Sequence, residues 1–429
     1  MFGFANFLLL ALFAAAVFDL IFALARGGGL RGALHGLWNT PHLLFGQQLA
    51  EWRLQLGRIL FAAGLAAYEI SVVFCNSMAR QNWAWVQGVM SPVLEWLAFL
   101  CFGAKILFGT RYTWRELLAG GALYFIARWV YFNSQNIWWI GIVVAVLAAK
   151  DVPLRRPLQV YFASGCAAMA VVLALHFAGI VAPDLTSERM GALRGTYGYG
   201  HPNTFGGLVF GLVLAYALLR AQKVRWVDCL LVFAVGVFLL VGPASRSAAL
   251  CTLALAVGLV FCRLRAGHSV PRWWPGTCAG MAGLTAAVSY LLPLLVIKVG
   301  PWNNDIGPAW LAKLDSLLTC RISLTWMAYR LLDVKIAGQV FNWPTVDNSF
   351  AFALFQFGPV VAALLGILFA AALWGHAKQG RRVEVCCLFA MLAYAYMEVQ
   401  PFHLTTNPTA LLLCGAVFAQ TSARWQKIE

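Results

Sequence analysis

Apolar runs long enough to cross a membrane recur from one end of this chain to the other. As a helix, a run of about 18 to 25 apolar residues covers a hydrocarbon core of about 30 Å. The sequence predicts about thirteen such spans in its 429 residues. They are 2–25, 57–76, 88–108, 116–133, 135–149, 158–182, 203–221, 226–243, 246–262, 275–297, 349–375, 383–400 and 408–422. We therefore expect an all-α polytopic membrane protein with about 12 to 14 transmembrane helices.

The composition leaves no room for a separate soluble domain. Hydrophobic residues make up 62% of the chain and charged residues only 11%, against roughly 25% charged residues in soluble domains. We expect a single integral membrane domain over residues 1–429, with a long external loop, 298–348, inserted before the late spans. The run 2–25 has neither a basic segment before it nor a small-residue cleavage site before Arg26, which favours a retained span over a signal peptide.

The net charge of +15 follows the membrane topology and does not point to nucleic acid. Twenty-one of the 31 Lys and Arg residues lie in alternate connections, which the positive-inside rule assigns to the cytoplasm. These connections are 26–58, 105–115, 150–156, 220–225, 263–272, 378–382 and the segment after 423. Tryptophans near the span ends, such as Trp138, Trp273 and Trp425, agree with an aromatic belt at the membrane surface.

The long external segment contains a helical pattern of its own, in "PAWLAKLDSLLTCRISLTWMAYRLLDVKI". Side chains for one helix face recur there at three- and four-residue spacing: Leu311, Leu314, Leu318, Ile322 and Thr325. The spacing predicts an amphipathic helix, expected at the outer membrane surface. Arg321 and Arg330 lie on this helix and are expected to reach inward or toward solvent.

Arg246 is the sharpest candidate for a functional cation. It lies between two long apolar spans in "GPASRSAAL", directly after Ser245, with almost no loop around it. Arginine stays charged in a poorly hydrated cleft and can hold phosphate oxygens bidentately. The position therefore predicts contact with an anionic substrate, and a snorkelling arginine at a helix end is the alternative. Arg194 and Arg321 are weaker candidates of the same kind.

The polar, glycine-rich stretch "RGTYGYGHPNTFGG" precedes a middle span. Its glycines permit close approach of a substrate, and Asn203 is a good N-cap for a span that begins at Thr204. His201 is one of two histidines in external connections, and an imidazole is the usual base near neutral pH. A solvated histidine without a role is the alternative for His201.

Two carboxylates lie at the outer ends of late spans. Asp347 is in "VDNSF", and Glu398 is in "YMEVQPFHL", which also contains the second external histidine, His403. The alternatives to a functional role are helix capping for Asp347 and a hydrogen bond within the bundle for Glu398. The eleven cysteines lie almost all in apolar spans and show no zinc-like spacing with histidine, so we expect no metal and no cofactor.

The second half of the chain contains six short motifs whose order and spacing are more specific than any one alone. They are "GYGHPNTFGG", "SRS", "CRISLTWMAYRLL", "IAGQVF", "VDNSFAFALFQFGPV" and "PFHLTTNPTALLL". Through them the chain resembles, over roughly residues 190–415, the bacterial O-antigen and capsular polysaccharide polymerases, which share a superfamily with the O-antigen ligases.

The resemblance implies a C-type glycosyltransferase-like, metal-independent enzyme in the cytoplasmic (inner) membrane of a bacterium, with its active site facing outward. Its substrate would be a polyprenyl-diphosphate-linked oligosaccharide for O antigen, capsule or exopolysaccharide. Membrane lipid, a chain-length regulator and a flippase would be its partners. The diphosphate-binding arginines of the family match Arg246 and Arg321, with Arg194 as a weaker third. Ligases carry a histidine in the stretch matching 341–349, where this chain has Asp347 and Asn348, which favours a polymerase.

The resulting hypothesis is that the protein transfers a growing glycan from polyprenyl diphosphate to a sugar hydroxyl of another lipid-linked repeat unit. The arginines would stabilise charge on the departing diphosphate, and His201 or Asp347 would orient or deprotonate the acceptor hydroxyl. The candidate substrate-binding residues are Arg194, Tyr199, Asn203, Ser245, Arg330, Asn348, Glu398 and His403. The alternatives are a ligase-type transferase that uses a different acceptor and a transporter of lipid-linked or acidic sugars.

Overall fold

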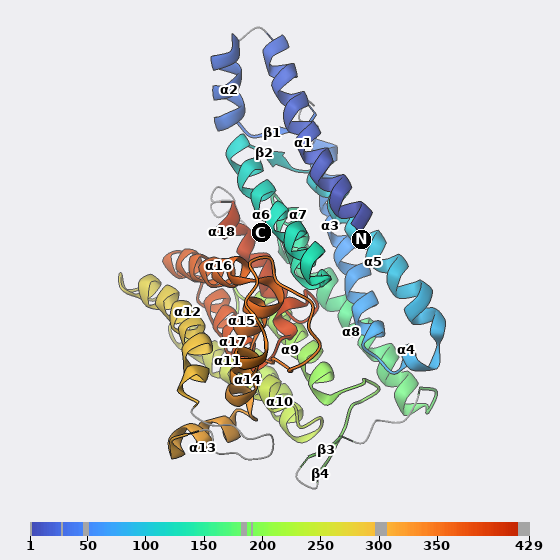
Figure 1. Ribbon diagram of the computed structural model, residues 1–429, viewed down its shortest axis with the longest axis vertical. Helices are drawn as coiled ribbons and strands as arrows, with labels where there is room; N and C mark the ends of the chain where they lie inside the picture. Colours follow the sequence, from blue (N-terminus) through green and yellow to red (C-terminus); the bar gives the residue numbers. More distant parts are fainter. Residues whose placement is uncertain are drawn as a thin grey trace. The chain divides into compact units, whose positions relative to one another are not determined.

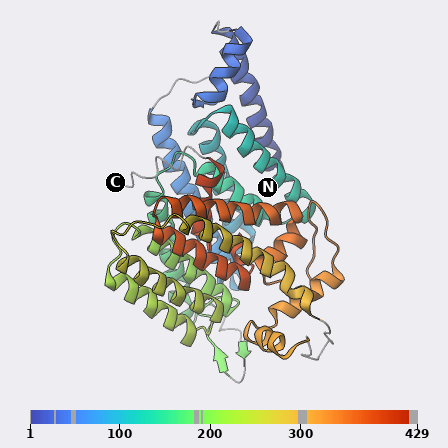
Figure 2. The ribbon, with the colours of Figure 1, turned by 90° about the vertical axis from the view of Figure 1, so that its left-hand side faces the viewer.

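The structure, a computed structural model, describes residues 2–26, 29–45, 51–181, 187–189, 192–296 and 307–418. The basic segment after 423, Trp425, the end of the predicted span 408–422 and the stretch 298–306 of the external loop lie outside these residues. The described chain is predominantly helical, as predicted (Figures 1 and 2). Eight helices among the described residues are long and apolar enough to cross a membrane. The chain is therefore a multi-pass, α-helical membrane protein.

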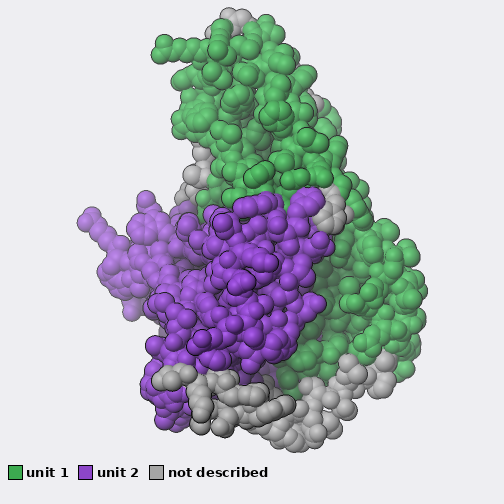
Figure 3. Space-filling view, viewed as in Figure 1, with its two compact units in different colours: residues 1–128, 140–204, 410–429 green, residues 129–139, 205–409 purple. Residues whose placement is uncertain are grey.

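The chain packs as two compact units (Figure 3). Unit 1 comprises residues 1–128, 140–204 and 410–429, and unit 2 comprises residues 129–139 and 205–409. The sequence predicted one integral membrane domain, because no hydrophilic linker interrupts the spans. Within that single stretch of spans, packing separates two sets of helices.

Unit 1 is centred on α3, which packs against α5 and α8. A Cβ atom at Gly64 of α3 would overlap the ring of Phe102 on α5, so glycine permits this close approach. Two short antiparallel ribbons belong to this unit: β1 pairs with β2 and joins two connections, and β3 pairs with β4 within one connection. The elements are α1 (Phe2–Ala25), α2 (Gly29–Asn39), β1 (His42–Leu43), α3 (Glu51–Cys75), α4 (Ala79–Asn82), η1 (Val86–Met90), α5 (Ser91–Phe108), β2 (Arg111–Tyr112), α8 (Arg155–Phe177), β3 (Ser187–Arg189) and β4 (Ala192–Arg194).

Unit 2 is a bundle in which α10 pairs with α11, α12 with α16, and α11 with α17; α12 and α16 can be followed in Figures 1 and 2. Four helical elements contain a boundary between the units: α6 (Trp114–Ser134), α7 (Ile137–Ala148), α9 (Pro202–Leu219) and the 3-10 helix η5 (Pro408–Leu413). The other elements of unit 2 are α10 (Trp226–Val241), α11 (Arg246–Leu264), α12 (Trp274–Leu291), η2 (Leu292–Leu295), α13 (Ala309–Leu317), α14 (Arg321–Leu331), α15 (Ser349–Phe352), η3 (Ala353–Phe357), α16 (Pro359–Lys378), α17 (Arg382–Met397) and η4 (Gln400–Phe402).

Connections that the charge count assigns to one side of the membrane gather within each unit. In unit 1, β1 of the connection 26–58 pairs with β2 of the connection 105–115, both predicted to be cytoplasmic. Two connections predicted to be external meet where Met78 N donates to Gly198 O at 2.8 Å. In unit 2, Arg382 donates to the carbonyl of His268 at 2.5 Å and thereby joins two connections predicted to be cytoplasmic. The alternation predicted from Lys and Arg therefore agrees with the packing of both units.

The structure differs from the predicted spans at two late positions. The span 349–375 is not one helix: a π-helical turn, η3, ends at Phe357, and α16 begins only after Gly358, whose φ is +88°. In the described part of 408–422 the chain forms a 3-10 helix, η5 (Pro408–Leu413), and one α turn, α18 (Cys414–Val417). At about 2.0 and 1.5 Å per residue these segments cover roughly 18 Å, too little for a bilayer core.

Four other predicted spans are helices that are shorter or less apolar than the eight helices that could cross a membrane. Helix α7 has 12 residues, and α10 and α17 have 16 each. Helix α6 has 21 residues, but Arg115, Glu116 and Arg128 lower its apolarity. About thirteen spans were predicted because any apolar run counts as a candidate, whereas a regular helix must also be long enough.

The single amphipathic helix predicted in the external loop is two helices, α13 and α14. The break falls at Thr319 and Cys320, whose φ angles of +61° and +63° are left-handed and cannot continue an α-helix. The predicted apolar face is nevertheless the packed face: Leu311 and Ile322 are buried against Val296. The periodicity was thus a correct guide to burial and a wrong guide to helix continuity.

Candidate functional site

The turn between α10 and α11 presents Arg246 at the tip of a helical hairpin. Helix α10 ends at Val241, and the turn closes with a hydrogen bond from Ser245 N to Leu239 O at 3.0 Å. Arg246 is the first residue of α11, and its side chain is exposed, with no bonding partner among the residues that the structure describes. Ser245 and Ser247, on either side of it, are buried. The hairpin therefore directs an unneutralised cation away from its own core.

Arg321 and Glu398 form a buried ion pair beside the same hairpin. Nη2 of Arg321 lies 2.7 Å from Oε1 of Glu398, and the two side chains are only 8% and 7% exposed. Ser247 Oγ donates to the same carboxylate oxygen at 2.9 Å and accepts from Arg321 at 3.3 Å. Ser247, Arg321 and Glu398 are hereafter the arginine–glutamate cluster. It joins the start of α11, the start of α14 and the residue after α17 (Figure 1).

The remaining donors of Arg321 go to backbone carbonyls. Nη1 donates to Leu318 O at 2.8 Å, and Nε donates to Met397 O. A guanidinium has five N–H groups, and four of them are engaged by these contacts and those of the cluster. Arg321 therefore has one N–H left for a ligand, unless the ligand displaces Glu398. This geometry suits a residue that positions its neighbours better than a bidentate clamp for a diphosphate.

Asp315 fixes the start of α14 and with it the direction of Arg321. Its carboxylate accepts from the backbone N–H groups of Ile322 and Ser323 at 2.8 and 3.2 Å. The hydroxyl of Ser323 donates to the same carboxylate at 2.8 Å. These bonds satisfy helix N–H groups that have no intrahelical partner. They also compensate for the left-handed residues just before Arg321.

The end of the glycine-rich stretch packs beside the cluster within unit 2. A Cβ atom at Gly206 of α9 would overlap the side chain of Ser245, and one at Gly207 would overlap Gln400 and Tyr394. The hydroxyl of Tyr394 donates to Gln400 Oε1 at 3.0 Å. The two glycines therefore let α9 approach the hairpin and the chain just beyond α17. Their role is close helix packing, in addition to any contact with a substrate.

The motif "VDNSF" caps a helix, but through Asn348 and not through Asp347. The Asn348 side chain accepts from Phe350 N and Ala351 N at 2.9 and 3.0 Å, and donates to Ser289 Oγ at 3.0 Å. Asn348 is thus a buried structural residue. Asp347 is half-buried, and its carboxylate lies close enough to Glu398 for the two charges to interact. Asp347 is therefore a second acidic residue within electrostatic range of the arginine–glutamate cluster.

The two remaining candidates of unit 2 have separate surroundings. Arg330 is exposed, with its guanidinium 5.3 Å from the centre of the Trp326 ring. His403 packs its imidazole against Trp138, with the ring centres 4.1 Å apart. Burial lowers the pKa of His403 from 6.5 to about 4. The ring is therefore neutral at pH 7 and is a weak base.

Four candidates belong to unit 1 and form a second set. Arg194 is buried, and its Nη2 donates to Asn203 Oδ1 at 2.9 Å. His201, and not Asn203 as predicted, occupies the position before the first residue of α9, and its Nδ1 accepts from Asn203 N at 3.1 Å. Tyr199 is fully buried and forms a β-bridge with Ser77. The set holds the start of α9 against the neighbouring connections of unit 1.

Sequence reasoning missed Ser247, Asp315 and Gln400. Ser247 could have been noticed because it directly follows Arg246. The sequence does not show, however, that its hydroxyl reaches the carboxylate of a residue 151 positions away. Asp315 lies in the predicted amphipathic helix and Gln400 lies two residues after Glu398, but the sequence does not show which groups their side chains reach. Among the described residues no group of three or more His, Cys, Asp or Glu side chains is placed to hold a metal ion.

Motifs separated along the chain therefore meet in unit 2. "SRS" supplies Ser247, "CRISLTWMAYRLL" supplies Arg321, and Glu398 stands just before "PFHLTTNPTALLL". The resemblance expected from the sequence rests on six motifs, of which "SRS" and "CRISLTWMAYRLL" contribute side chains to the arginine–glutamate cluster. Comparison of the chain with protein-family models, with curated proteins and with solved structures found no match.

Proposed function

We propose that this protein is a membrane glycosyltransferase that polymerises lipid-linked oligosaccharide units on the outer face of a bacterial cytoplasmic membrane. The observation that carries the proposal is the exposed Arg246 beside the buried Arg321–Glu398 pair. All three residues lie in segments that the charge pattern assigns to the outer side. The motif resemblance adds the donor class, a polyprenyl-diphosphate-linked glycan.

Arg246 is the residue that binds the diphosphate in this proposal. It is an exposed cation at the turn of the hairpin, and as the first residue of α11 it stands at the positive end of a 19-residue helix. Both features favour an anionic oxygen at that place. Arg321 is proposed as a positioning residue, because most of its donors hold Ser247, Glu398 and backbone carbonyls. This division modifies the expectation that both arginines clamp the diphosphate.

The chemical step is displacement at the anomeric carbon of the donor glycan. The oxygen of the acceptor hydroxyl forms a bond to that carbon while the bond to the diphosphate oxygen breaks. The electron pair leaves with the diphosphate, where Arg246 stabilises it. The hydroxyl proton passes to a carboxylate. We assign this role to Asp347, which is half-buried and within electrostatic range of Glu398.

Replacement of Arg246 by Ala tests the assignment. Loss of a charge-stabilising donor typically costs about 10²- to 10³-fold in rate, so long products should disappear when purified protein is incubated with lipid-linked oligosaccharide. The polymerisation rate of Arg246→Lys should lie between those of the wild type and Arg246→Ala, because lysine keeps the charge but lacks the planar guanidinium. Arg263→Ala is the matched control, since Arg263 is exposed near the opposite end of the same helix.

Product size separates this proposal from its alternatives. A transporter moves the substrate across a vesicle membrane without changing its length, and a ligase joins the finished glycan to a different acceptor. If Arg246→Ala folds normally and still makes long chains at the wild-type rate, the assignment of Arg246 is wrong.

A further inference from the structure

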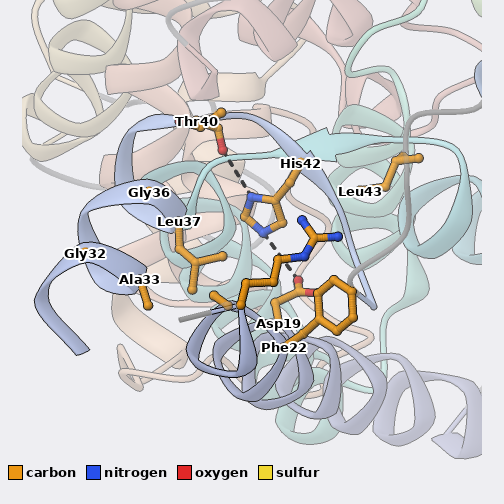
Figure 4. A pocket seen from close by; sticks show the side chains of 11 residues that line it. Asp19, Phe22, Gly32, Ala33, Gly36, Leu37, Thr40, His42 and Leu43 are labelled. Atoms are coloured by element: carbon orange, nitrogen blue, oxygen red, sulfur yellow. Dashed lines mark hydrogen bonds and ion pairs between the residues drawn. The ribbon is translucent and has the colours of Figure 1, made fainter. Parts of the chain in front are cut away.

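A cavity of about 250 Å³ lies between α1 and α2 in unit 1 (Figure 4). Its walls are the last two turns of α1, one face of α2 and the residues leading into β1. None of the residues proposed above for glycosyl transfer lines it. The cavity is therefore a separate feature, and its explanation does not depend on the proposed function.

Two glycines make the wall that α2 contributes. Gly32 and Gly36 are one helical turn apart, and both line the cavity. A Cβ atom at either position would meet nothing within 4 Å. Close packing therefore does not require glycine there, and a larger side chain would enter the cavity without a clash. Glycine leaves the backbone of α2 accessible to a ligand along one turn of the helix.

The polar residues of the cavity lie at two depths. Arg26 follows the last residue of α1, and Asp19 lies on α1 about 10 Å farther along the helix axis. The Asp19 carboxylate is buried and 3.3 Å from Nε2 of His42. Burial lowers the pKa of His42, but hydrogen bonds with Asp19 and the Thr40 carbonyl, together with the Asp19 charge, leave that pKa above 6.5. The imidazole thus offsets the buried acid, while Arg26 remains as the cation of the cavity.

The surroundings of the cavity are cationic and apolar together. The sequence from Arg26 to Ala50 contains no Asp or Glu. Arg115 adds a cation beside α2, with its guanidinium 5.4 Å from the Trp38 ring. Large apolar side chains at four-residue spacing, Leu30, Leu34 and Trp38, are exposed on α2. This combination is typical of a helix that lies in the head-group region of a membrane with anionic lipids.

We propose that the cavity between α1 and α2 binds one anionic phospholipid, with the phosphate on Arg26 and the glycerol region against Gly32 and Gly36. The chemistry of the walls selects this ligand: a cation lies at the end of a membrane span, and apolar residues such as Phe22 and Leu37 lie below it. The exposed apolar side chains on another face of α2 favour a place for this helix among the lipids of one leaflet. Charge complementarity favours an anionic lipid over a zwitterionic one.

Native mass spectrometry tests the proposal. The full-length protein is mixed in detergent with phosphatidylglycerol or phosphatidylcholine, and the lipid that stays bound after release from detergent is identified. One phosphatidylglycerol should be retained, in preference to phosphatidylcholine. Arg26→Gln should weaken retention about tenfold, because it removes a charged hydrogen-bond donor. Gly36→Leu should abolish retention by filling the cavity. Two controls should retain lipid normally: Arg31→Gln, which removes a cation of α2 outside the cavity wall, and Gly280→Leu, at an equally open glycine of α12.

Each contrary result overturns the proposal. Equal retention of the two lipids would exclude charge selection, and an equal loss in Arg26→Gln and Arg31→Gln would show unspecific attraction to a basic surface. Retention by Gly36→Leu would show that lipid binds elsewhere. A wild-type dimer that becomes monomeric in Gly36→Leu would identify a second copy of the chain as the occupant. Unfolding temperatures of all variants confirm that each one is folded.

Discussion

The guanidinium of Arg321 holds together three segments of unit 2 through one charge pair and a set of carbonyl contacts. Two charges at this depth are costly to remove from water, and their mutual attraction offsets that cost only while both are present. Ser247 and the carbonyl of Leu318 complete the hydrogen bonding of the pair. The cluster is therefore sensitive to the loss of either charge.

Glu398→Ala should destabilise the protein by about 3 kcal/mol or more, because it leaves the Arg321 charge buried without its partner. The measurement is thermal or denaturant unfolding in a fixed detergent. The double variant Arg321→Met, Glu398→Leu should recover most of the loss, since it removes both charges at similar volume. Arg330→Ala, at an exposed arginine of the same helix, should change stability by well under 1 kcal/mol. An unchanged unfolding temperature for Glu398→Ala would contradict this account.

His403 predicts a pH dependence of stability. Its pKa is lowered from 6.5 to about 4 by burial, so the unfolded chain binds a proton at a higher pH than the folded protein does. The contribution of neutral, buried His403 to the free energy of unfolding is complete above pH 6.5 and is lost as the pH falls from 6.5 toward 4. The unfolding temperature should drop less between pH 7 and pH 5 in His403→Gln than in the wild type. Identical pH profiles for the two proteins would refute the assignment.

At the scale of elements, helix ends depend on groups that the periodicity does not contain. The apolar spacing from Leu311 to Thr325 continues without interruption, yet the chain breaks at Thr319 and Cys320. Asp315 supplies the capping bonds that make a new helix start favourable at Arg321. The same holds for α15, where Asn348 and not its neighbour Asp347 accepts the helix N–H bonds. To predict where α14 and α15 begin, one must know which side chain points at the free backbone N–H groups.

The pairing of α11 with α17 can be tested through two thiols. Cys262 and Cys386 lie on these helices with their sulfur atoms 3.5 Å apart. A mild oxidant such as copper phenanthroline should remove two electrons and two protons from the thiols and join the helices covalently. Mass spectrometry of unreduced peptides should identify a Cys262–Cys386 link, which Cys262→Ser abolishes. Exclusive linkage through Cys387, the next residue along α17, would contradict the described packing.

At the scale of the whole molecule, the distribution of Lys and Arg predicts which connections share a side of the membrane. Packing within each unit groups the connections in the same way. Alkaline phosphatase, which is active only outside the cytoplasm, can be inserted into the full-length protein at Gly267 or at Gly338. The insertion at Gly338 should be active and the insertion at Gly267 inactive. Activity at Gly267 alone would reverse the orientation and place Arg246 on the cytoplasmic side.

The sequence by itself determined the class of this protein, because apolar run length and charge distribution act through the membrane and need no tertiary contact. It also singled out Arg246 as a candidate, because a position between two apolar runs is a local property. Only the tertiary structure decided that Arg321 is paired with Glu398, that Ser247 joins them, and that Gly206 and Gly207 serve close packing. Those contacts join residues far apart in the chain, and their strength depends on burial, which a linear pattern does not specify.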